Sequence, residues 1–101
     1  MDKEVVHTPQ VPAARVPLSQ AIKAGDWVFA SGQLGLDVAT GRLVPGGIAA
    51  ETRQVCENLK AILEAAGSSL ENVVKVTSGT TFQCVALVGG ARVEIEATAF
   101  V

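Results

Sequence analysis

A single segment of this 101-residue chain, residues 48–66, has the periodicity of an α-helix, and this restricts the fold. Apolar side chains recur there at every third or fourth position, which indicates a helix with one buried face. Gly67 follows the last apolar position and predicts the end of the helix. Polar side chains are expected on its other faces, among them Glu51, Glu57, Lys60 and Glu64. One helix flanked by strand-like segments predicts an α+β domain, with the helix packed on one face of a sheet.

Strands are predicted on both sides of this helix, because β-branched or alternating segments are separated by turn residues. Gly25-Asp26 predicts a hairpin between two of them, and Val88–Ala91 predicts another. In the last segment, Val93, Ile95, Ala97 and Ala99 are expected to face one way and Arg92, Glu94, Glu96 and Thr98 the other. The expected strands cover residues 4–8, 18–23, 27–31, 73–77, 80–88 and 91–99, with an extended stretch at 34–36.

The segment Gly25–Gln33 contains a candidate site. Its apolar run, Trp27–Ala30, predicts a strand buried on both faces. The run is ended by Ser31-Gly32-Gln33. Gly32 has no side chain, so a ligand or another backbone can approach closely there, and the residues beside it supply hydrogen-bonding groups. Ordinary strands also end in this way.

Composition restricts the partners of the chain. Hydrophobic residues make up 49% of it and its mean hydropathy is +0.37, which for one small domain predicts a surface buried against another subunit. The net charge is −2 and the eight Lys and Arg are scattered, so we expect no nucleic-acid partner. No stretch approaches membrane-spanning length and the charged start lacks a signal-peptide core, so we expect a cytoplasmic protein without membrane contact.

Metal ligands are not predicted. Cys56 and Cys84 lie far apart in the sequence and outside any metal-binding spacing, so both are expected to be small buried residues in a reducing compartment. His7 is the only histidine and stands in a proline-rich lead-in without potential co-ligands.

Six further pieces carry motifs: Pro17–Asp26, Leu34–Asp37, Thr40–Ile48, Asn58–Gly67, Asn72–Thr77 and Gly90–Ala97. In this order and at these spacings the chain closely resembles the Rid/YjgF family of reactive-intermediate (imine) deaminases, over residues 13–101. The resemblance implies a chorismate-mutase-like fold with a mixed sheet, in a homotrimer whose sheets form a central barrel and whose clefts lie between subunits. It also implies hydrolysis of 2-imino acids, or their enamine tautomers, to 2-keto acids and ammonia, with no cofactor and no metal.

The chain departs from the family at Ser78-Gly79. Family members carry a second helix and a loop there, so this single domain of residues 1–101 is roughly 25 residues short of the family at 78–79, and two residues cannot join parallel strands. Either the chain is a divergent or truncated variant, or the sequence omits a segment of the protein. The same junction removes the family's catalytic arginine, whose guanidinium would grip a substrate carboxylate, and Gly79 stands in its register. Arg15 and Arg92 are the conceivable substitutes, without a positional reason for either.

The resemblance assigns candidate roles by position. Glu94 matches the family's water-orienting acid and is the predicted catalytic residue, although an alternating charged strand face is often only solvated. Ser31 and Gly32 match the ligand-contacting strand end. Leu18 stands where many members have a tyrosine, and Thr81 lies beside the expected arginine.

The sequence is compatible with two other functions. Without its arginine, the chain could be a non-catalytic Rid-like protein that binds a small ligand or a partner. Nucleic-acid cleavage is the third reading and has neither a basic groove nor interleaved aromatic residues to support it.

Overall fold

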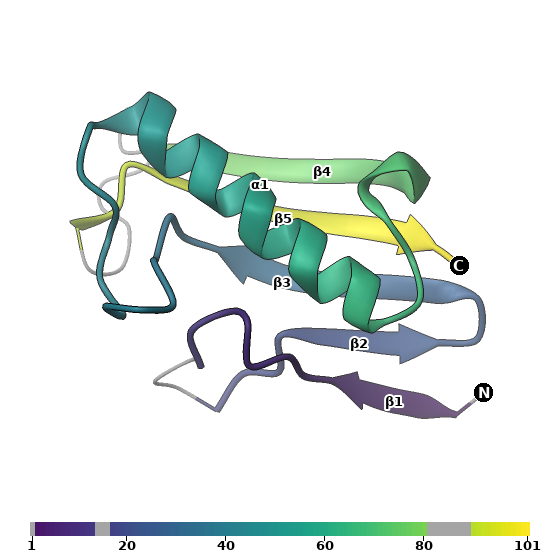
Figure 1. The fold of residues 1–101 in the computed structure, drawn as a ribbon. Helices are drawn as coiled ribbons and strands as arrows, with labels where there is room; N and C mark the ends of the chain where they lie inside the picture. Colours follow the sequence, from purple (N-terminus) through teal and green to yellow (C-terminus); the bar gives the residue numbers. More distant parts are fainter. Residues whose placement is uncertain (1, 14–16, 81–89) are drawn as a thin grey trace.

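The structure is a computed structural model that describes residues 2–13, 17–80 and 90–101 (Figure 1). Five described strands form one sheet in the order β1-β2-β3-β5-β4. Helix α1 crosses one face of this sheet, and both ends of the chain lie at the same edge of the molecule. The strands are β1 (Lys3–Val6), β2 (Ala21–Ala24), β3 (Trp27–Gln33), β4 (Val73–Thr80) and β5 (Val93–Phe100), and the helix spans Ile48–Ala65. The predicted α+β class is confirmed.

Every pair of neighbouring described strands is antiparallel, so the expected mixed sheet is wrong for this part of the chain. The connections explain why. The Gly25-Asp26 hairpin joins β2 to β3, and α1 stands between β3 and β4 along the chain. Because β5 is inserted between β3 and β4 and runs opposite to both, no two neighbours are parallel. The strand expected over residues 80–88 lies outside the described residues, apart from Thr80, which belongs to β4.

Helix α1 ends as the sequence predicts. Ala66 is its C-cap, and Gly67 has a positive φ of 85°. The amide of Gly67 donates to the Glu64 carbonyl (3.0 Å) and that of Ser68 to the Leu63 carbonyl (2.8 Å), which is a Schellman motif. A glycine is favoured here because other residues are strained at this φ.

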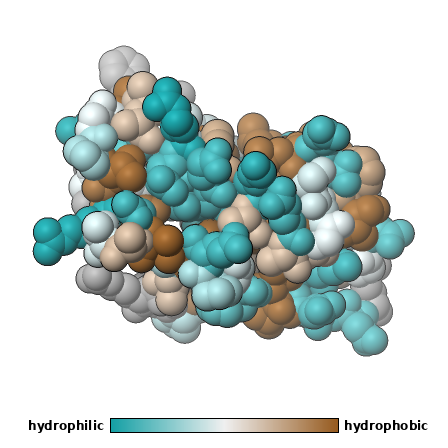
Figure 2. Space-filling view, viewed as in Figure 1, coloured by the Kyte–Doolittle hydropathy of each residue, from teal (hydrophilic) through white to brown (hydrophobic). Residues whose placement is uncertain are grey.

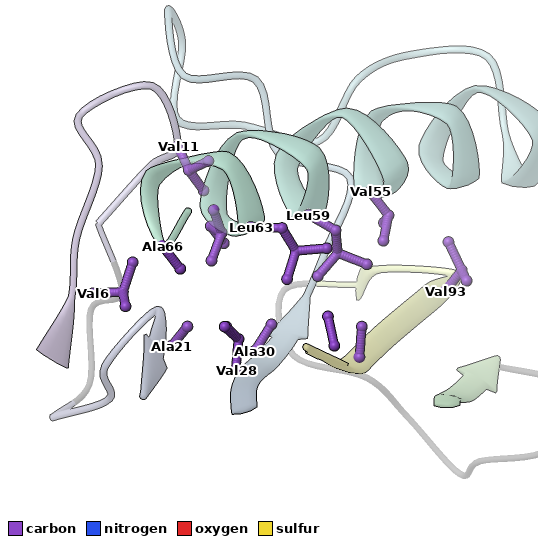
Figure 3. Close-up of a cluster of buried hydrophobic side chains, with 13 residues drawn as sticks. Val6, Val11, Ala21, Val28, Ala30, Val55, Leu59, Leu63, Ala66 and Val93 are labelled. Atoms are coloured by element: carbon purple, nitrogen blue, oxygen red, sulfur yellow. The ribbon is translucent and has the colours of Figure 1, made fainter. Parts of the chain in front are cut away.

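The core lies between α1 and the sheet (Figure 3). Ile62 and Leu63 are fully buried and lie over strand residues such as Val28 and Ala30. These positions recur at the helical spacing that the sequence shows, so burying them stabilises the helix and the sheet together. The buried cluster consists of Val6, Val11, Ala21, Val28, Ala30, Val55, Leu59, Ile62, Leu63, Ala66, Val93, Ala97 and Ala99.

The two faces of the sheet differ. Hydrophilic side chains cover much of the face that carries α1 (Figure 2). The opposite face has no described helix over it, and we call it the open face. Trp27 and Phe29 alternate with the buried Val28 and Ala30, and they are 44% and 49% exposed. The prediction that Trp27–Ala30 is buried on both faces is therefore wrong for a single copy of the chain, because one helix covers only one face.

Candidate active site

The site residues gather where β3 ends beside β5. Ala30 pairs with Ala97, but Gln33 pairs with Ile95, so three steps along β3 match two along β5. This register shift is a β-bulge with one extra residue at Ser31-Gly32. Bulges redirect side chains and are over-represented beside active sites. The predicted strand end is therefore also a break in the ladder.

Glu94 lies directly against this bulge. A Cβ placed on Gly32 would lie 2.7 Å from Cδ of Glu94 and 3.0 Å from its Cγ and Oε1. On the other side, Gly79 of β4 is the register partner of Glu94. The Glu94 side chain is partly buried and stands between two glycines, so its carboxylate occupies space that larger neighbours would fill.

Ser31 is fixed by hydrogen bonds to the segment before β2. Its Oγ donates to the Ser19 carbonyl (2.7 Å) and its amide donates to the Gln20 carbonyl (2.9 Å). The hydroxyl proton is therefore engaged, and the oxygen is left as an acceptor. Gln20 is itself buried, and its side chain accepts from the Thr8 amide and donates to the Thr8 carbonyl. Ser31 is thus connected through Gln20 to Thr8.

The structure brings together three of the five predicted site residues: Ser31, Gly32 and Glu94. Leu18 is 59% exposed and immediately precedes Ser19, whose carbonyl accepts the Ser31 hydroxyl. Thr81 lies outside the described residues.

Glu51 and Arg92 form a pair that the sequence analysis missed. The Glu51 side chain is fully buried, which corrects the expectation that it lies on an exposed face. Its Oε1 accepts the Arg92 amide (2.9 Å) and its Oε2 accepts Nη1 of Arg92 (2.7 Å). Burial opposes ionisation, but the Arg92 amide and guanidinium outweigh it and hold the pKa of the Glu51 carboxyl below its usual value. The helical spacing could have predicted that Glu51 is buried, because it precedes Val55 by four residues and so lies on the same buried face of the helix.

Arg92 corrects a second expectation. It precedes β5 and its guanidinium bonds to the helix, so it does not share the strand face of Glu94 and Glu96. The alternation predicted from Val93 onward is confirmed, with Val93, Ala97 and Ala99 buried and Ile95 partly buried.

Two surface hollows among the described residues are not lined by Glu94. These hollows, of about 410 Å³ and 270 Å³, are lined in part by His7 and Lys23 and by Gln10 and Lys60. No cluster of three potential metal ligands occurs among residues 2–13, 17–80 and 90–101. Within the same ranges no helix is long and apolar enough to cross a membrane. Cys56 is exposed, so the expectation that it is buried is wrong, and Cys84 lies outside these ranges.

The fold and the site define a small α+β protein with an acidic group at a bulged strand end. Residues 8–81 match the family model described as endoribonuclease L-PSP. The chain belongs to this family, which is the Rid/YjgF family.

Three relatives illustrate the match. A RutC family protein of Pyrococcus horikoshii is 56% identical over 75 residues, which are 74% of this chain and 60% of that protein. A mouse protein named 2-iminobutanoate/2-iminopropanoate deaminase is 38% identical in an alignment of length 122 that covers 96% of this chain and 90% of the mouse protein. The crystal structure of RidA from an Antarctic Psychrobacter is 37% identical, with a TM-score of 0.93 over 97% of this chain and 99% of the other. The chain thus matches less than two thirds of the length of the Pyrococcus relative.

Proposed function

We propose that this protein hydrolyses reactive 2-imino acids, or their enamine tautomers, to 2-keto acids and ammonia. The observation that carries the proposal is the Glu94 carboxylate, which lies against the glycine of a bulged strand end with a second glycine opposite it. Relatives that match nearly the whole chain are named 2-iminobutanoate/2-iminopropanoate deaminases. Their name supports the same reaction class here.

The proposed reaction needs a water and one group that moves a proton. The Glu94 carboxylate accepts a proton from water while the water oxygen bonds to C2 of the imine and the C=N electron pair moves to nitrogen. Glu94 then returns the proton to nitrogen. The hydroxyl of the tetrahedral intermediate then gives its proton, through Glu94, to nitrogen as the C–N bond breaks, so that ammonia leaves and the C2 carbonyl forms. The backbone at Ser31-Gly32 is the proposed contact for the substrate.

We further propose that the clefts lie between subunits of a homotrimer. Large apolar side chains gather on the open face, where Val5, Trp27, Phe29 and Phe100 are between 42% and 65% exposed. A surface of this kind on a small chain is typical of a buried interface. A second subunit over this face would also reduce the water around Glu94, which strengthens electrostatic interactions with a bound substrate.

A second function is favoured by one observation. Gly79, and not an arginine, is the register partner of Glu94, and the guanidinium of Arg92 is bonded to Glu51. A site without a carboxylate anchor would suit a non-catalytic Rid-like protein that binds a small ligand or a partner. Titration with 2-oxobutyrate separates the two, because tight and saturable binding indicates an anchor.

Keto-acid release from enzymatically generated 2-iminopropanoate tests the main proposal. Acceleration above the spontaneous rate supports it. A rate equal to the spontaneous one, at high protein concentration, contradicts it.

A further inference from the structure

Helix α1 holds both sides of the candidate site through polar groups on its buried face. On one side, the Glu51 carboxylate accepts the Arg92 amide, and Arg92 stands two residues before Glu94. This bond is made to the main chain, so it restrains the path of β5 where the strand begins. Nη1 of the Arg92 guanidinium donates to the second carboxylate oxygen, so Arg92 bonds both oxygens of Glu51.

On the other side, α1 is hydrogen-bonded to the chain just after the bulge. Nδ2 of Asn58 donates to the carbonyls of Leu34 (3.2 Å) and Leu36 (3.0 Å). Between them, Gly35 packs so closely on Glu51 that a Cβ there would lie 2.7 Å from the Glu51 Cα and 2.8 Å from its carbonyl oxygen. The stretch that follows Gly32 is therefore fixed to the same helical face that holds Arg92.

A fully buried carboxylate such as that of Glu51 contributes less to stability than its contacts suggest, because of its desolvation. Removing a carboxylate from water costs free energy, whereas burying an apolar side chain of similar size is favourable, and buried ion pairs often contribute little net stability. They do fix one geometry, because their hydrogen bonds are directional. Glu51 meets this description, since both of its carboxylate oxygens are bonded to the residue that leads into β5.

We propose that Glu51 is a positioning residue, which sets where the Glu94 carboxylate lies relative to Gly32 by fixing the main chain at Arg92. The expected effect of Glu51 on turnover rests on the proposed function, whereas its expected effect on the position of the Glu94 carboxylate does not. Glu51 does not touch the reacting atoms in this account.

Glu51→Ala is the direct test. The expected result is a fall in kcat of about 100-fold with little change in KM, because a displacement of about 1 Å in a reacting group has an effect of that size. The amide signal of Gly32 and the side-chain carboxyl signal of Glu94 are expected to shift in NMR spectra. Glu51→Gln keeps an oxygen for the Arg92 amide, so it should lose less activity than Glu51→Ala.

Val55→Ala is the matched control. Val55 is fully buried one turn further along the same helix face, so this variant is destabilised without a change in the Arg92 contact. Its kcat, measured well below the melting temperature, and its NMR signals at Gly32 and Glu94 should stay those of the wild type.

Two results would overturn the inference. One is wild-type kcat and unshifted signals in folded Glu51→Ala. The other is equal shifts in Val55→Ala, which would reduce Glu51 to a contributor to stability. If the wild type shows no deaminase activity, the proposed function fails, yet the NMR signals still test the positioning of Glu94.

Discussion

Gly32→Ala isolates the contact between the strand bulge and Glu94. The added Cβ would lie 2.7 Å from Glu94 Cδ, whereas non-bonded carbons rest at about 3.5–4.0 Å. The carboxylate must therefore move by about 1 Å, and a shift of that size lowers kcat about 100-fold if Glu94 handles the water.

The stability of Gly32→Ala should change little. Gly32 has no positive φ, so alanine fits its backbone, and the colliding atoms are the flexible end of a side chain. Rotating Glu94 away from its preferred rotamer costs about 0.5–1.5 kcal/mol. The reduced entropy of the unfolded chain offsets about 0.4–1 kcal/mol of that. The free energy of unfolding, from urea titration, should stay within about 1 kcal/mol of the wild type.

Gly35→Ala is the matched control, because its Cβ would meet the backbone of Glu51, which cannot rotate away. It should lose about 1–3 kcal/mol of stability. The double variant Gly32→Ala/Glu94→Gln should be no slower than Glu94→Gln alone, since the two changes act on one group. Wild-type kcat in Gly32→Ala, or a loss of stability equal to that of Gly35→Ala, would show that the contact between Gly32 and Glu94 does not set the position of the catalytic carboxylate.

Three further predictions follow from the packing and charges. The pKa of Glu51 is lower in the folded than in the unfolded chain. Ionised Glu51 therefore stabilises the fold at pH values above its usual pKa of 4.5, and this contribution is lost as the pH falls through the pKa of the folded state. Glu51→Gln should therefore cost about 1–3 kcal/mol at pH 7 and less in acid, and a pH-independent difference in urea unfolding would contradict this. Phe29→Lys places a charge on the open face and should yield monomers in analytical ultracentrifugation. Val38→Lys, at a position that is 50% exposed, should leave the oligomer intact. A persistent trimer in Phe29→Lys would count against an interface on the open face. Ile62→Ala should lose about 2–5 kcal/mol in thermal or urea unfolding, because Ile62 is fully buried, and Ile48→Ala, half exposed, should lose much less.

Local patterns predicted much of the fold. The spacing of Val55, Leu59 and Ile62 and the glycine at 67 predicted α1 and its end, since both depend on neighbouring residues. Gly25-Asp26 predicted the β2–β3 hairpin for the same reason. The antiparallel order could not be read in this way, because the insertion of β5 between β3 and β4 depends on contacts across the chain.

The site was partly predictable. Gly32 and Glu94 were named from motifs, but the bulge that brings them together is a register shift between distant strands. Glu51 was placed on a face of the helix other than its apolar one, whereas the structure buries it. Its partner Arg92 is 41 positions away in sequence, so the pattern around Glu51 could not reveal the pair.

The catalytic role of Glu94 is tested by the rate of 2-oxobutyrate formation from enzymatically generated 2-iminobutanoate, compared among the wild type, Glu94→Gln and Glu96→Gln. Glu96 lies two residues further along β5 and is exposed, so it is the matched carboxylate. We expect acceleration by the wild type and by Glu96→Gln, with a loss of about 100-fold or more in Glu94→Gln. A wild-type rate equal to the spontaneous one, or equal rates in the two variants, would contradict the catalytic role of Glu94.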